Sequence, residues 1–308
     1  MIRLRWFHIH SWLALTLLLG MAPAAGAGLD VAVVVSQRTG PHAVFAQAFS
    51  RAAASLGHRV FDAGTPADGL DDVALARADL VIASGDAALS AALRLHPRPT
   101  LAVMIGQSRF DGIRREHPSW PLSAFTLDQP AERQLRLLKA VLPEARRVGV
   151  LFGPEGADRP AFERAARVSH LELAERVVGD ESELMRGLEA VLRDSDGLVA
   201  LPDALLATPA SVRSILLTSY RHQKPIIGFS RAYVGAGALA AIFTTPEQVA
   251  GDVIAWLRTQ DGGRVALPPV RGPASFEIAV NRQVARALGM SVVADEELLR
   301  LIATGDVP

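Results

Sequence analysis

The sequence predicts an α/β protein with two doubly wound parallel-sheet lobes joined by a three-segment hinge. Short β-branched runs alternate with amphipathic helical patterns along the chain, which is typical of a parallel sheet covered by helices. The 308 residues, 50% of them hydrophobic, can build the cores of two lobes. Two similar strand-to-helix passages, at 125–131 and 243–247, are further expected to be crossings between those lobes.

Residues 1–27 are predicted to be a signal peptide. Arg3 and Arg5 give a basic start, 12–19 is an apolar run, and 25–27 (AGA) matches the small-residue cleavage rule. A retained membrane anchor is the alternative, but the apolar run is shorter than the roughly 20 residues needed to span a bilayer. The chain has no cysteine, which excludes a lipidated N-terminal cysteine and disulfides. We therefore expect the mature protein to be free in the periplasm and not a lipoprotein.

The charge balance gives no sign of a nucleic-acid partner. Removal of Arg3 and Arg5 from the 32 basic residues leaves 30 against 32 acidic ones, so the mature chain lacks the basic surplus of nucleic-acid-binding proteins. Its only lysines are Lys139 and Lys224.

The first lobe is expected to be built from β-α units. A strand at 29–36 consists of β-branched residues, as in strands buried on both faces of a parallel sheet. Asp86 is predicted to cap a helix after the turn 84–86. The other expected elements are a helix at 42–56, a strand at 58–62, a helix at 70–77, a strand at 79–83 and a strand at 100–105.

The lobe boundaries are placed at the predicted crossings. Before the helix at 247–258, Thr245 and Gln248 form a capping box, with Pro246 at the first helical position. Ordinary capping explains these residues equally well, and only the order of elements favours a crossing. A proline-rich stretch, 268–273, is the third passage. The expected division is 28–125 plus 245–268 for lobe 1, and 126–244 plus 269–308 for lobe 2.

The second lobe contains the most informative stretch, 196–242. A buried strand at 197–201 is followed by a helix with Thr208 as N-cap and Pro209 at its first position. The strands that come next are expected to pair in parallel with the first through a right-handed crossover. Val212, Ile215, Leu216 and Tyr220 are predicted to share one face of this helix. The other expected elements are a helix at 131–142, strands at 147–153, 171–178, 224–228, 238–243 and 276–280, and helices at 160–170, 181–193 and from Asn281.

Several segments of this lobe resemble a known family. RVGVLFG at 147–153, LPDA at 201–204, GALA at 237–240 and FEIAVNRQVARALGM at 276–290 match, in order and spacing, segments of ABC transporter substrate-binding proteins. This family has the type I periplasmic binding protein fold and includes aromatic amino-acid binders. The chain departs from the family pattern at Gly153 and at Ala204, where the usual residue is asparagine. The resemblance covers nearly the whole mature chain.

No catalytic motif, metal-binding motif or cofactor fingerprint emerges. The histidines are scattered without metal-ligand spacing, and no phosphate loop is present. Ser230 lies in GFSRA, which lacks the second glycine of a nucleophile elbow. Gly235 and Gly237 are interpreted as turn residues. The sequence therefore predicts no catalytic residue, no metal and no cofactor.

Polar residues after strand ends are the predicted ligand-binding set, because ligands of such sheets bind at the carboxyl ends of the strands. Amides at the 84–86 helix start would bind a carboxylate, Asp203 would accept from a ligand ammonium, and Arg231 would meet an anion. The set comprises Ser36, Gln37, Ser84, Gly85, Asp86, Gln107 and Ser108 in the first lobe, and Glu155, Asp203, Ser230 and Arg231 in the second.

Each of these roles has a purely structural alternative. Asp86 would simply cap its helix, Asp203 would end its strand, and Arg231 would be solvated or join a surface ion pair. Phe152, Phe229 and Tyr233 would line an apolar wall, although a core position is the default for phenylalanine.

The resulting hypothesis is a non-enzymatic solute-binding protein that closes its lobes on a small molecule, with an amino acid as the first candidate. The resemblance implies an ABC permease in the inner membrane as partner, and we expect a monomer. One alternative is a ligand-sensing partner of a membrane receptor kinase that acts without transport. Another is an exported hydrolase, for which nucleophile and base are missing.

Overall fold

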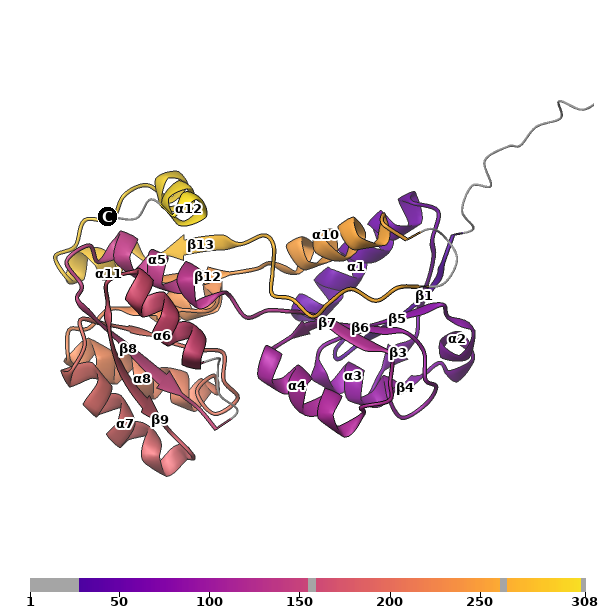
Figure 1. Cartoon of the computed structure of the whole chain (residues 1–308), viewed down its shortest axis with the longest axis horizontal. Coiled ribbons are helices and arrows are strands. Elements are labelled where there is room, and N and C mark those ends of the chain that lie inside the picture. The colour runs from indigo at the N-terminus through magenta and orange to yellow at the C-terminus, as the bar shows by residue number, and fades with distance from the viewer. Residues whose placement is uncertain (1–27, 155–158, 261–264, 306–308) are drawn as a thin grey trace, which may run out of the picture.

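The computed structural model describes residues 28–154, 159–260 and 265–305. The chain forms two lobes side by side, each with its own sheet, linked by three extended passages (Figure 1). The expected α/β architecture of two doubly wound lobes is thus confirmed. The predicted signal peptide lies outside the described residues. Within the described ranges, no helix combines the length and apolar character that crossing a membrane requires.

Lobe 1 is organised around a parallel sheet with the strand order β2-β1-β5-β6-β7. A small antiparallel pair, β3 and β4, lies outside this sheet. The elements of lobe 1 are β1 (Asp30–Val35), α1 (Gly40–Ser55), β2 (Arg59–Asp62), β3 (Gly64–Thr65), β4 (Gly69–Leu70), α2 (Asp72–Arg77), β5 (Leu80–Ser84), α3 (Asp86–Ala92), β6 (Thr100–Ile105), α4 (Gln107–Glu116), β7 (Leu122–Thr126) and α10 (Pro246–Leu257).

Lobe 2 has the sheet order β13-β12-β11-β10-β8-β9, parallel except for the antiparallel edge strand β13. Its elements are α5 (Ala131–Val141), β8 (Arg147–Phe152), α6 (Arg159–Val168), β9 (Glu172–Val177), α7 (Glu181–Arg193), β10 (Gly197–Val199), α8 (Pro209–Arg221), β11 (Ile226–Gly228), α9 (Arg231–Ala236), β12 (Ala240–Phe243), β13 (Glu277–Val280), α11 (Arg282–Ala287) and α12 (Asp295–Thr304).

The two sheets share one topology. In each, the second strand along the chain lies at the edge beside the first, and the later strands add on the other side of the first. The order therefore reverses between β1 and β5 in lobe 1 and between β8 and β10 in lobe 2. In open α/β sheets, ligands bind outside the carboxyl ends of the strands at such a topological switch point.

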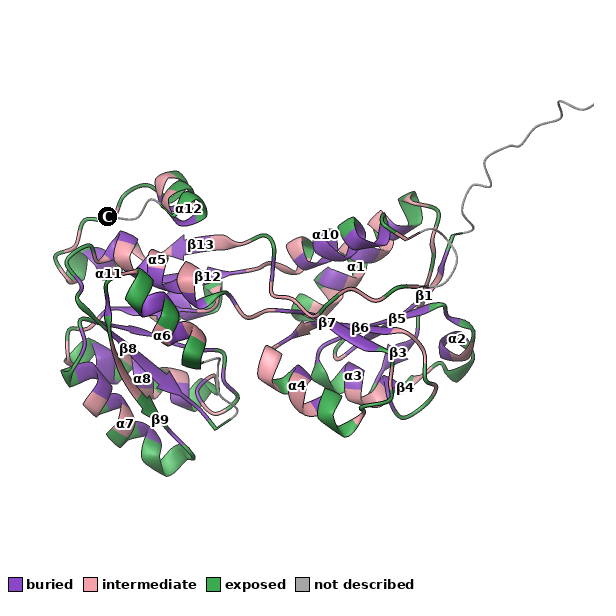
Figure 2. Cartoon of the chain, in the orientation of Figure 1, coloured by how far each residue is buried: buried purple, intermediate pink, exposed green. Residues whose placement is uncertain are grey.

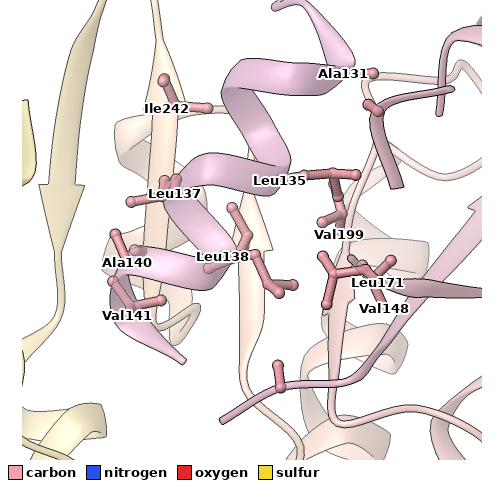
Figure 3. Packing of buried hydrophobic residues seen from close by; sticks show 14 of the residues in the cluster. Ala131, Leu135, Leu137, Leu138, Ala140, Val141, Val148, Leu171, Val199 and Ile242 are labelled. Atoms are coloured by element: carbon pink, nitrogen blue, oxygen red, sulfur yellow. The ribbon is translucent and has the colours of Figure 1, made fainter. Parts of the chain in front are cut away.

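Apolar side chains on both sides of each sheet form separate cores, and nearly all residues of the central strands are buried (Figure 2). In lobe 2, α5 turns Leu135, Leu137 and Leu138 onto the sheet, against residues that include Val199 and Ile242 (Figure 3). All three leucines are 0% exposed. Truncating one of them to alanine would cost about 2–5 kcal/mol.

Helix α10 brings a late part of the chain back to lobe 1. Its buried face, with Val249, Val253 and Trp256, joins the core formed by β1 and α1. The predicted capping box is present, since Thr245 accepts from the Gln248 amide and the Gln248 side chain accepts from the Thr245 amide. These contacts support our proposal that residues 245–268 belong to lobe 1, with the lobe boundaries predicted from the sequence.

Some elements differ from the sequence expectation. Gln107 and Ser108 begin α4 and are not loop residues, and Gly235 lies within α9 rather than in a turn. α12 and the β3–β4 pair were not predicted. On α8 the buried positions include Ile215, but Tyr220 is 75% exposed, so the predicted common face is wrong for Tyr220.

Candidate functional site

The carboxyl ends of the two sheets face each other. The chain leaves the end of β7 and reaches α5 of lobe 2 through residues 127–130, and it leaves the end of β12 and reaches α10 of lobe 1 through residues 244–245. Both short passages start from carboxyl ends, so these ends point toward the opposite lobe (Figure 1). The predicted site residues follow these strand ends.

In lobe 1, Ser36, His42, Ser84 and Gly85 come together at the switch point between β1 and β5. The His42 Nδ1 atom lies 2.9 Å from Ser84 Oγ, and Ser84 is fully buried. The Ser36 hydroxyl accepts from the Ala88 amide of α3 at 3.1 Å. A Cβ at Gly85 would overlap with Ser36 Oγ and lie 2.7 Å from His42 Cε1. Glycine at this position is what allows the cluster to close.

Sequence reasoning did not select His42. Burial lowers its pKa below the usual 6.5, and the charge of Asp86 opposes this shift to a smaller extent. The imidazole is therefore neutral at pH 7, and it presents one donor and one acceptor nitrogen. Its only sequence signal was its position at the predicted start of the helix that follows the first strand.

At the start of α3, the amides of Gly85, Ala87 and Ala88 already have partners, whereas the Asp86 amide has no hydrogen bond among the described residues. Gly85, not Asp86, is the N-cap residue, so the predicted capping role of Asp86 is wrong. The Gly85 amide donates to the Val103 carbonyl at 2.8 Å, and the Ala87 amide donates to the Asp86 carboxylate at 2.8 Å. Asp86 also faces Arg109 at 3.3 Å. A carboxylate ligand would have to replace some of these bonds.

Gln107 and Ser108 lie in the first turn of α4, after β6, while Gln37 is exposed after β1. The Gln107 amide donates to the Asp128 carboxylate at 2.6 Å, and its side chain donates to Asp111 at 2.8 Å. Burial raises the pKa of Asp128, because desolvation outweighs the hydrogen bonds that its carboxylate accepts. Asp128 belongs to the first crossing, so this contact ties the crossing to lobe 1.

In lobe 2, Asp203 and Gly153 meet at the switch point between β8 and β10. Asp203 is 8% exposed, and its Oδ1 atom accepts from the Leu205 amide at 2.9 Å. A Cβ added to Gly153 would overlap with all three carboxyl-group atoms of Asp203. The family's asparagine therefore cannot replace Gly153 unless the Asp203 carboxylate moves away.

Ser230 and Arg231 follow β11 at the start of α9. The Ser230 hydroxyl caps this helix by accepting from the Tyr233 amide at 3.2 Å. Arg231 pairs with Glu277 at 2.9 Å, and its guanidinium lies 5.2 Å from the centre of the Phe243 ring. The arginine side chain is 67% exposed, as in the surface ion-pair alternative. Glu155 lies outside the described residues.

The aromatic residues are distributed differently from the predicted common wall. Phe152 is 2% exposed and packs edge to face on Phe162, so it is a core residue. Phe229 and Tyr233 contact each other, with ring centres 5.1 Å apart, and line a groove on lobe 2.

A hydrogen-bonded chain joins all three crossings and was not predicted. The Gln129 side-chain amide donates to Thr244 Oγ1 at 2.8 Å, and the Thr244 hydroxyl donates to the Ser275 carbonyl at 2.8 Å. Arg133 donates to Gln129 Oε1 at 2.7 Å and to the carbonyl of Pro273, at the end of the third crossing, at 3.3 Å. The partners of Thr244 are 31 and 115 positions away in sequence, so no local pattern could reveal them.

The described residues contain no cluster of three or more histidine, cysteine, aspartate or glutamate side chains placed to hold a metal ion. What the two edges offer is a set of hydroxyl, imidazole and carboxylate groups on rigid strand ends. Such groups can hydrogen-bond a small polar ligand.

The fold is similar to that of solved binding proteins. A ligand-free, open substrate-binding protein with adhesive properties from Clostridium difficile has a TM-score of 0.64 and 18% identity, covering 86% of this chain and 96% of the other. An ABC domain in complex with L-Trp from Streptococcus pneumonia has a TM-score of 0.59 and 16% identity, with coverages of 88% and 98%. A periplasmic ribose ABC transporter protein from Conexibacter woesei has a TM-score of 0.52 and 14% identity, with coverages of 89% and 98%.

No match was found among curated protein sequences. The profile of the family described as ABC transporter substrate binding protein matches residues 122–304, which is more than half of the chain. Proteins of this kind bind small solutes and typically work outside the cytoplasm without catalysing a reaction. The sequence match and the two-lobed fold together show that this chain belongs to the ABC transporter substrate-binding protein family.

Proposed function

We propose that this protein captures a small molecule between its lobes and delivers it to an inner-membrane ABC permease for import. The two sheet edges with their polar residues would form the walls of the binding site, and the three passages would act as the hinge. A ligand that contacts both edges favours the closed arrangement, because only that arrangement provides both sets of contacts.

The Asp203 carboxylate supports an amino acid, or another ammonium-bearing molecule, as the ligand. It is almost fully buried at the switch point, and only its Oδ1 atom has a hydrogen bond among the described residues. The other oxygen is free to accept from a ligand ammonium in a charge-assisted bond. The L-Trp named for one structural neighbour agrees with this class of ligand.

Thermal-shift screening of the mature chain, residues 28–308, tests the proposal. Amino acids, peptides, sugars and organic acids would each be added to the purified protein. We expect some amino acids to raise the melting temperature, since a ligand that binds only the folded state stabilises it. Isothermal titration of each hit should give one site per chain.

Variants then locate the site. Asp203→Ala should weaken binding of an amino-acid hit by about 10–100-fold, the effect of removing one charge-assisted hydrogen bond. Asp194→Ala, at the exposed end of α7, is the matched control and should leave affinity unchanged. Binding of sugars only, or equal effects of the two variants, would exclude an ammonium site at Asp203.

A further inference from the structure

A groove runs along the outer surface of lobe 2, between α8 on one side and α9 with α11 on the other. It encloses about 680 Å³, which lies within the roughly 300–1,000 Å³ range of small-molecule sites. Leu216 and Leu217 come from α8, Phe229 and Tyr233 from the α9 segment, and Leu288 from the end of α11. All of these residues belong to lobe 2, so the groove does not depend on how the lobes are arranged.

The groove exists because α9 is too short to cover its neighbour. α9 has 6 residues beside the 13 of α8, and it ends at Gly237, whose φ of +128° favours glycine. Part of the α8 surface is therefore left uncovered. Leu217 is 54% exposed there, at the edge of an apolar groove that it shares with Leu216 and Phe229.

Tyr233 provides a polar group without a partner beside this groove. The residue is 3% exposed, and its hydroxyl forms no hydrogen bond within the described part of the chain. Burial raises the pKa of this hydroxyl, so it remains protonated and able to donate. A buried donor without an acceptor costs about 1–3 kcal/mol. The hydroxyl oxygen has essentially no exposed surface, so a ligand in the groove reaches the ring of Tyr233 but not its hydroxyl.

The charges around the groove have one sign. None of the described residues that line it is acidic, and the two charged ones are Arg213 and Lys224. Desolvation raises the pKa of Asp196, but the hydrogen bonds from the Arg147 and Arg146 amides, helped by the charge of Lys224, lower it overall. An anion therefore already lies close to this lysine. Arg213 has neither an ion pair nor a hydrogen bond among the described residues and is exposed on α8. An anion at the groove would therefore meet an uncompensated cation.

We propose that this groove is a second ligand site, separate from the space between the lobes, and that it binds a small amphipathic monoanion such as a medium-chain carboxylate. The apolar body lies along Leu216, Leu217 and Phe229. The anionic head pairs with Arg213. Apolar burial supplies most of the affinity, and the cation selects the sign of the charge.

Probes of matched length and different charge test this assignment on the mature chain. Binding of decanoate, decanol and decyltrimethylammonium, each below its micelle-forming concentration, would be measured by isothermal titration. We expect saturable binding of decanoate at one site per chain, at least 10-fold tighter than binding of the other two. Equal affinity for decanol, or no saturable binding of decanoate, would overturn the proposal.

Variants on the surface of α8 assign the site. Leu217→Asp and Arg213→Glu should each weaken decanoate binding at least 10-fold. Arg221→Glu makes the same charge change at an exposed position on the same helix, outside the groove, and should change affinity less than 2-fold. An equal loss with both arginine variants would mean general charge attraction, and would contradict a site at Arg213.

Two further measurements separate this site from other possibilities. Tyr233→Phe should fold normally, since the hydroxyl has no hydrogen-bond partner among the described residues, and should change decanoate affinity less than 2-fold, since the hydroxyl is covered. A larger loss would contradict a head group held at Arg213. Asp203→Ala should leave decanoate binding intact, so a failure of the interlobe proposal is distinguishable from a failure of this one. A dimer in sedimentation that Leu217→Asp dissociates would show a second copy in the groove, and would overturn the small-molecule assignment.

Discussion

At both topological switch points, a glycine after one strand leaves room for a polar side chain that follows the neighbouring strand. The strand that carries the glycine in one lobe corresponds to the strand that carries the polar side chain in the other lobe. In lobe 1 the glycine, Gly85, follows β5, which is the third strand of the main sheet along the chain, and Ser36 after β1 lies over it. In lobe 2 the glycine, Gly153, follows the first strand, and Asp203 lies over it from the end of the third.

The two sites also differ in charge and in backbone conformation. Lobe 1 offers neutral hydroxyls and an imidazole, whereas lobe 2 offers a carboxylate. Gly85 has a φ of +95° and a ψ of 165°, a region that side chains essentially exclude, while Gly153 has no positive φ. One topology can therefore present two kinds of ligand contact. The lobe 1 glycine is required by the backbone itself, and the lobe 2 glycine only by a side chain.

The largest expected effect is that of Gly85→Ala. The new methyl group combines a strained backbone with overlap at Ser36 and His42, and we expect a loss of about 3 kcal/mol or more in unfolding free energy. Gly251→Ala is the matched control, on an exposed helical position of α10 with nothing within 4 Å. It should stabilise the protein by about 0.5–1 kcal/mol. Urea denaturation of both variants measures the difference, and equal effects would contradict the strain argument.

Gly153→Ala should lower the unfolding free energy by less, about 1–2 kcal/mol, because the Asp203 side chain can move aside. In an Asp203→Ala background the same substitution should cost almost nothing, since the overlapping carboxylate is gone. A double-mutant cycle by urea denaturation should give a coupling of about 1 kcal/mol. Additive single effects would mean that Gly153 is needed for another reason.

The hinge contact between the lobes should have a smaller effect. Thr244→Val keeps the shape but removes the hydroxyl that links Gln129 to the Ser275 carbonyl, and should cost about 1 kcal/mol. Thr259→Val is the control, because the exposed Thr259 hydroxyl bonds only within its own helix end. Chemical denaturation compares the two, and a larger loss for Thr259→Val would refute the linking role of Thr244.

The smallest expected effect is the pH dependence of stability that His42 contributes in lobe 1. The pKa of His42 is lower in the folded protein than its unfolded value of 6.5. As the pH falls below 6.5, the unfolded chain therefore binds a proton at this histidine before the folded chain does. The contribution of His42 to stability is therefore complete above pH 6.5 and declines as the pH falls through the folded pKa. His42→Asn should flatten the melting-temperature profile between pH 7 and 5. Parallel profiles of variant and wild type would exclude this origin.

Local signals predicted the helix starts well. Thr208 with Pro209 and Thr245 with Gln248 cap α8 and α10 as expected, because caps depend on hydrogen bonds within a few residues. Asn281 was predicted to begin a helix, and it is the N-cap of α11. Buried strands such as 100–105 were equally clear, since residues covered on both faces leave a continuous apolar run. Asp86 failed as a cap because a positive-φ glycine before it already serves as the N-cap residue.

The sequence by itself determined the alternation of strands and helices, most caps and the family, because these depend on neighbouring residues and on short motifs. Only the tertiary structure decided that Asp203 occupies the space over Gly153, that His42 reaches Ser84, and that α8 is left partly uncovered. These contacts join residues far apart in the chain, and their geometry follows from the packing of whole strands and helices.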